Sequence, residues 1–122
     1  MNLLDAMTDP ALFGDQYGGD SWANWRALLA GFYALDLDEQ QAATFRTLTD
    51  REPHTLPADE LWLVIGRRGG KSAAAALLAV FEAVFNDHRA KLAPGEIATV
   101  MVIAADRKQA RAVMRYVRGL LE

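Results

Sequence analysis

Cysteine is absent from this 122-residue chain, and histidine occurs only twice. A chain without cysteine forms no disulfide, no thiolate-ligated zinc or iron–sulfur site, and carries no thiol nucleophile. Two histidines are too few for a multi-histidine metal site. No apolar run approaches the ~18 residues of a membrane span, and the first five residues lack the basic start of a signal peptide. These absences predict a protein of a reducing cytoplasm with no membrane partner.

The charge of the chain is divided unevenly along its length. The net charge is only −3, but residues 1–61 hold eleven acids and three bases, while residues 62–122 hold five acids and ten bases. With 52% apolar residues, the chain has the composition of one ordinary globular domain. The basic second half favours an anionic partner such as phosphates or nucleic acid, although a basic helix face is often only solvated.

The first half of the sequence predicts a helical lead-in over residues 1–59. Residues 1–20 are acidic and glycine-bearing, which is typical of a loosely held segment with Leu12, Phe13 and Tyr17 as anchors. Ser21 is expected to cap a helix that continues to Phe32. A second helix is expected to open at a capping box formed by Asp36 and Glu39, with Phe45 and Leu48 facing inward.

The second half, residues 60–122, has the pattern of strand, glycine loop, helix, strand and helix. The apolar runs at 61–65 and 97–105 are typical of buried parallel strands. A buried helix is expected over 73–85, a turn at Pro94-Gly95, and a last helix capped by Asp106 with Gln109. This order predicts an α/β protein with the P-loop NTPase fold, a parallel sheet in three α/β/α layers. Because few strands are available, the fold is expected to be incomplete.

The segment between the first run and the helix contains the residues of a phosphate-binding P-loop (Walker A motif). It reads Gly66-Arg67-Arg68-Gly69-Gly70-Lys71-Ser72. Glycines let backbone N–H groups surround phosphate oxygens, and the N-terminus of the next helix adds partial positive charge. Lys71 would reach the β- and γ-phosphates of ATP, and the Ser72 hydroxyl would bind Mg²⁺.

The loop departs from the usual motif at its beginning. Ile65 occupies the position of the first glycine, and Gly66 follows one residue late. Two arginines then lie inside the loop, and either could stabilise charge on a transferring phosphoryl group. The competing interpretation is a glycine-rich turn with solvated arginines.

Several motifs in order resemble the large terminase subunit of tailed bacteriophages. That family has a deviant P-loop in which arginine follows the opening small residue, as Arg67 does here. The segment from Gly19 to Leu29 is similar to the family's tryptophan-containing lead-in helix, and Thr49-Asp50-Arg51 to its Thr-Gly-Arg element, with Asp50 in place of glycine. Glu60-Leu61-Trp62 resembles the entry to the family's P-loop strand. Residues 103–111 resemble the family's strand-to-helix turn after the P-loop helix, which is comparable to helicase motif Ia.

The resemblance implies an ATPase motor that packages double-stranded DNA into procapsids, with ATP and Mg²⁺ as cofactors. It implies a ring of subunits on a portal, with a small terminase subunit as a further partner, in the host cytoplasm. Lys71 and Ser72 take the phosphate and Mg²⁺ roles, and Arg67 the charge-stabilising role in its own subunit or a neighbour. Trp25 and Arg26 are candidates for the adenine pocket, although two tryptophans at helical spacing are more often core residues.

Two features of the proteins in that family are missing from this sequence. No apolar run ends in the Asp-Glu pair that would hold Mg²⁺ and orient water, and no nuclease domain with clustered carboxylates is present. We therefore expect the chain to be the opening part of a longer protein that binds ATP without hydrolysing it alone. Another P-loop motor, such as a helicase-like ATPase, and a non-catalytic nucleotide- or anion-binding module remain alternatives.

Other charged residues support weaker hypotheses. Lys108, Arg111, Arg115 and Arg118 form a stripe that would face DNA phosphates, solvent or another domain. His54 and His88 are expected to have no functional role. Glu82 and Asp87 could form a carboxylate pair, but their spacing does not set a geometry.

Overall fold

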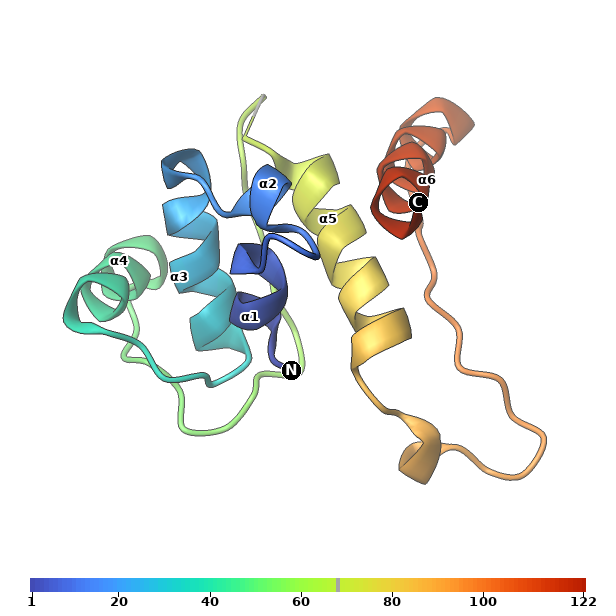
Figure 1. The fold of residues 1–122 in the computed structure, drawn as a ribbon, viewed down its shortest axis with the longest axis horizontal. Coiled ribbons are helices and arrows are strands. Elements are labelled where there is room, and N and C mark those ends of the chain that lie inside the picture. The colour runs from blue at the N-terminus through green and yellow to red at the C-terminus, as the bar shows by residue number, and fades with distance from the viewer. Residues whose placement is uncertain (68) are drawn as a thin grey trace. The chain divides into compact units, whose positions relative to one another are not determined.

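The computed structural model describes residues 1–67 and 69–122, and Arg68 lies outside the described residues. The chain divides into two units, Met1–Val64 and Ile65–Glu122, which are taken in turn. Figure 1 colours the first unit from blue to green and the second from yellow-green to red.

The first unit is built from four α-helices in chain order. They are α1 (Leu3–Thr8), α2 (Gly14–Tyr17), α3 (Ala23–Phe32) and α4 (Glu39–Thr49), and a 3₁₀ turn at Asp20–Trp22 leads into α3. Helix α3 packs against both α1 and α4 (Figure 1). The core of the first unit includes four fully buried side chains from α1, α3 and α4: Leu3, Met7, Leu29 and Phe45. Because Leu3 and Met7 are fully buried, residues 1–20 are part of this core, and the expectation of a loosely held lead-in is wrong.

Side-chain caps start α1 and α4 in this unit, whereas α2 and α3 have none. The cap of α4 does not lie at the expected position. The carboxylate of Asp38 accepts a 2.7 Å bond from the Gln41 N–H, and the Gln41 side chain accepts from the Asp38 N–H at 3.2 Å. This capping box starts α4 two residues later than the predicted pair at Asp36. Helix α3 has no side-chain cap, so Ser21 does not have its predicted role.

A close approach between α3 and α4 depends on a glycine. Phe45 is 2% exposed and its ring lies directly on the backbone of Gly31. A Cβ atom at position 31 would overlap with this ring. The predicted inward position of Phe45 is confirmed, whereas Leu48 is 49% exposed and does not face the core. The pair Gly31–Phe45 therefore fixes how α4 sits on α3.

The second unit consists of two long helices and the chain that joins them. Helix α5 (Lys71–Val80) continues into a π-helical turn (Phe81–Phe85), and a 3₁₀ turn (Arg89–Lys91) follows before α6 (Arg107–Leu121). Helices α5 and α6 pack side by side, as Figure 1 shows. The buried residues of α5 are Ala74, Ala76, Leu77 and Val80. The predicted turn at Pro94-Gly95 is present, with Gly95 at a φ of 88°.

The expected α/β P-loop fold with its parallel sheet is wrong. The described residues form six α-helices and no strand. Both predicted strands are extended chain in which most side chains are exposed, with Trp62 87% and Ile103 84% exposed, while Leu61, Ile65 and Val102 are half-buried. A run becomes a strand only when a neighbouring strand satisfies its backbone N–H and C=O groups. Neither run has such a neighbour among residues 1–67 and 69–122, so high apolar and β-branched content alone did not produce a sheet.

The cap of α6 was predicted correctly and gives a measurable stability effect. The Asp106 carboxylate accepts a 2.9 Å hydrogen bond from the Gln109 N–H at the first turn. We expect Asp106→Ala to lower the free energy of unfolding of the second unit by about 1 kcal/mol. Urea denaturation followed by circular dichroism measures this loss. The exposed Glu122, at the other end of the helix, supplies the control substitution Glu122→Ala, which should have a smaller effect.

Candidate phosphate-binding loop

The loop before α5 favours glycine at two positions. A Cβ atom on Gly69 would overlap with the side chain of Ile65, and Gly70 has a φ of 80° in the left-handed region. The Gly69 N–H donates to the Gly66 carbonyl at 3.3 Å, which closes the loop on itself. Beside Gly66 the space is open, with no described heavy atom within 4 Å of a Cβ built there.

Lys71 and Ser72 are the first two residues of α5. Gly70 is the N-cap, and no side chain of the described residues caps the helix at that end. The first intrahelical bond runs from the Ala74 N–H to the Gly70 carbonyl at 2.8 Å. The amides of the first turn therefore precede the helical ladder, and such amides bind anions together with the positive end of the helix dipole. The Lys71 side chain is exposed and Ser72 is half-buried.

The structure describes one of the two arginines of the loop. Arg67 is exposed in a turn ahead of Gly69. Arg68 was predicted to contribute to the same site and lies outside the described residues. The described residues of the predicted phosphate site therefore lie in the loop and helix start of the second unit. They are Gly66, Arg67, Gly69, Gly70, Lys71 and Ser72.

Trp25 and Arg26, the candidates for an adenine pocket, lie in α3 of the first unit. The Arg26 Nη1 donates to the carbonyls of Tyr17 and Gly19 at 2.7 and 2.8 Å. The Trp25 ring lies 6.1 Å from the ring of Trp22, in a tilted arrangement. These contacts give both residues a role in holding the segment before α3. Trp22 and Trp25 are half-buried and are not among the buried core residues.

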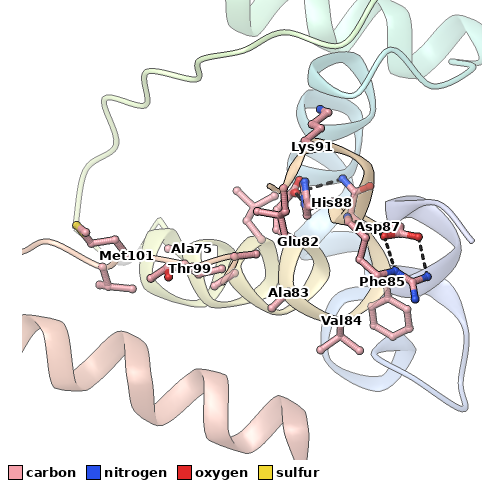
Figure 2. A pocket seen from close by; sticks show the side chains of 18 of the residues that line it. Ala75, Glu82, Ala83, Val84, Phe85, Asp87, His88, Lys91, Thr99 and Met101 are labelled. Carbon is pink, nitrogen blue, oxygen red and sulfur yellow. Dashed lines mark hydrogen bonds and ion pairs between the residues drawn. The ribbon is translucent and has the colours of Figure 1, made fainter. Parts of the chain in front are cut away.

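A broad pocket of the second unit lies elsewhere along α5. Its walls come from the second half of α5, the turns at residues 81–91, the extended chain at 98–103, and Val113 of α6 (Figure 2). None of the described residues of the glycine loop lines it. The pocket and the predicted phosphate-binding loop are therefore separate features of the second unit. The loop remains a candidate site because of its backbone geometry and not because it lines a pocket.

Polar side chains gather at one end of this pocket. The Glu82 carboxylate accepts from Asn86 at 3.1 Å, and its Oε2 atom lies 2.7 Å from Nε2 of His88 (Figure 2). Arg89 forms two side-chain bonds of 3.0 and 2.8 Å with Asp87, which lower the pKa of Asp87 and raise the pKa of Arg89. Glu82 and Asp87 therefore have separate partners and do not form a carboxylate pair. Sequence spacing had not indicated the contact between His88 and Glu82.

The basic stripe on α6 is exposed along its whole length. Lys108, Arg111, Arg115 and Arg118 all lie in solvent, and within the described part of the chain none of the four forms an ion pair. Packing of α6 on α5 involves its less exposed apolar positions, Ala110, Val113, Val117 and Leu120. Two further apolar residues of α6, Met114 and Leu121, are 44% and 59% exposed.

Comparison of this chain with protein-family models, curated proteins and solved structures found no match. Within the described residues, no three metal-binding side chains cluster. No helix there is long and apolar enough to span a membrane.

Proposed function

We propose that this chain binds ATP and Mg²⁺ as the N-terminal part of a phage terminase large subunit. The observation that carries the proposal is the glycine loop that ends at left-handed Gly70 and leads directly into α5 at Lys71 and Ser72. Further support comes from the resemblance of Gly66–Ser72 and its flanking segments to that family. Phosphate binding within this proposal depends on the glycine loop and the helix start.

Four residues of the loop and helix start have proposed roles that follow from their chemistry. The amides of Gly70, Lys71 and Ser72 would donate to phosphate oxygens at the start of α5. The Lys71 ammonium, on a flexible exposed side chain, would pair with the β- and γ-phosphates, while the Ser72 hydroxyl would bind Mg²⁺. Arg67 would stabilise charge on the γ-phosphoryl group. The family resemblance also proposes Trp25 and Arg26 for contacts with adenine.

Binding of a fluorescent ATP analogue tests this proposal. We expect saturable binding that requires Mg²⁺ and is displaced by ATP, with no phosphate release, because no Asp-Glu pair follows an apolar run. Turnover would contradict the expectation that the chain binds ATP without hydrolysing it, and it would leave the proposed binding site in place. Absence of binding at millimolar nucleotide would remove the proposal altogether.

In the complete protein, the proposed function is packaging of double-stranded DNA into a procapsid. The proposed partners are a portal, a small terminase subunit and further copies in a ring, in the host cytoplasm. The alternatives are a helicase-like P-loop motor and a non-catalytic nucleotide- or anion-binding module. The sequence encoded after Glu122 discriminates between the motors, because a terminase continues into a nuclease domain and a helicase into a second motor domain.

The stripe on α6 is proposed to contact DNA phosphates. Its four bases are exposed, while the less exposed apolar positions of α6 lie toward α5, so the stripe itself offers an electrostatic interaction. We expect log Kd for duplex DNA to depend steeply on log salt, and Arg115→Ala to reduce that slope by about 1. Fluorescence anisotropy over a salt series measures both. Arg51→Ala, at an exposed position of the first unit, is the matched control and should leave the slope unchanged; equal slopes for both variants would exclude the stripe.

A further inference from the structure

The side chain of Ile65 lies against the backbone of Gly69 in the glycine loop. Its Cγ2 atom occupies the place where a Cβ atom on Gly69 would be, and its Cβ atom lies 3.7 Å from that place. Ile65 is half-buried, unlike the exposed Val64 before it and Gly66 after it. One apolar side chain at the start of the loop therefore contacts the loop just before α5 begins.

This contact limits where Gly69 can lie. Ile65 branches at Cβ, and the contacting Cγ2 methyl belongs to that branch, so its position depends on the single torsion χ1, which is stiff in β-branched residues. The other link across the loop is the hydrogen bond from the Gly69 N–H to the Gly66 carbonyl. At 3.3 Å it is longer than most N–H···O bonds. The apolar contact is therefore needed to keep the loop closed.

The contact lies directly before the amides proposed to bind phosphate. Gly69 is followed by Gly70, the N-cap of α5, and then by Lys71 and Ser72. Donors that are already held in place bind an anion more tightly, because less conformational entropy is lost when the ligand arrives. A residue that fixes Gly69 thus affects nucleotide affinity without touching the nucleotide.

We propose that Ile65 is a positioning residue, which holds the glycine loop in its nucleotide-binding shape through its Cγ2 methyl. The inference rests on the proposed binding of Mg²⁺-ATP at this loop. Ile65 occupies the position at which the loop departs from the usual motif, where a glycine is expected. The departure therefore has a function of its own, because a glycine at position 65 would have no side chain to place on Gly69.

Two substitutions of Ile65 separate the Cγ2 methyl from the rest of the side chain. Valine keeps the branch at Cβ and loses only the terminal Cδ1 methyl, whereas alanine removes Cγ2 as well. In a titration with a fluorescent ATP analogue and Mg²⁺, we expect Ile65→Ala to bind about tenfold more weakly than the native chain, and Ile65→Val to stay within about twofold of it. Circular dichroism is expected to show native helix content in both. Native affinity in Ile65→Ala, or equal weakening in both variants, would overturn the proposal.

A substitution of Gly69 tests the same contact from the other side. The added methyl of Gly69→Ala would overlap with Ile65, so we expect binding to weaken about tenfold. Gly119→Ala is the matched control, because a Cβ atom on this glycine of α6 meets no described atom within 4 Å. In the double variant of Ile65→Ala with Gly69→Ala the new methyl has room, so binding should be no weaker than in Ile65→Ala alone. Losses that simply add would show that the two residues act independently and would overturn the proposal.

Lys71→Ala distinguishes this inference from the proposed function on which it rests. If Lys71→Ala weakens nucleotide binding while Ile65→Ala and Gly69→Ala bind as the native chain does, the loop is the binding site and Ile65 does not position it. If the native chain does not bind the analogue at all, both the proposed function and the role of Ile65 are overturned.

Discussion

Phe45→Ala is expected to lower the free energy of unfolding of the first unit by about 3–5 kcal/mol. Phe45 is 2% exposed, and its ring fills the space that Gly31 leaves open between α4 and α3. The ring also meets His54 edge-to-face, with the ring centres 5.7 Å apart. Truncation would leave a cavity at the place where α4 is held. Urea or heat denaturation followed by circular dichroism measures the loss.

Leu48→Ala provides the control for this prediction. Leu48 lies on the same helix but is 49% exposed, so its truncation should cost about 1 kcal/mol or less. A similar loss for both variants would show that Phe45 is not the anchor of α4. The result would then contradict the packing described for the first unit.

Lys71→Ala is expected to weaken binding of Mg²⁺-ATP at least tenfold. A charge-assisted hydrogen bond contributes about 1.5–3 kcal/mol, and at about 1.4 kcal/mol per factor of ten this gives a ten- to hundredfold change. The Lys71 side chain is exposed, so its truncation should leave the helices of the chain intact. Titration with a fluorescent ATP analogue measures the change in affinity.

Lys91→Ala is the matched control, because Lys91 is an exposed lysine of the same unit outside the glycine loop. We expect its affinity for Mg²⁺-ATP to stay within about twofold of the native value, as is usual for a screened, distant charge. Equal weakening by both substitutions would indicate general attraction of an anion to a basic unit. Unchanged affinity in Lys71→Ala would exclude the glycine loop as the site.

Local features of this chain were predictable from sequence because a few neighbouring residues determine them. Asp106 caps α6 as expected, and Phe45 lies in the core at its predicted face. The cap of α4 was misplaced because Asp36 and Asp38 both have a polar residue three positions later, and only the geometry shows that Asp38 is used. The glycine loop was placed correctly just before a helix, which begins at Lys71.

The tertiary features could not be predicted in the same way. Residues 61–65 and 97–105 have strand-like composition, but a sheet depends on partners distant in sequence, and neither run has one in the described chain. The two carbonyl contacts of Arg26 and the pairing of His88 with Glu82 also depend on how turns bring backbone and side chains together. Residue spacing alone carries no signal for these contacts.

Amide chemical-shift mapping of the native chain during titration with Mg²⁺-ATP tests the central claim most directly. We expect the largest saturable shifts at the amides of Gly69, Gly70, Lys71 and Ser72, with small changes along α6. Shifts confined to α6 or to the first unit, with the loop amides unmoved, would contradict nucleotide binding at the glycine loop.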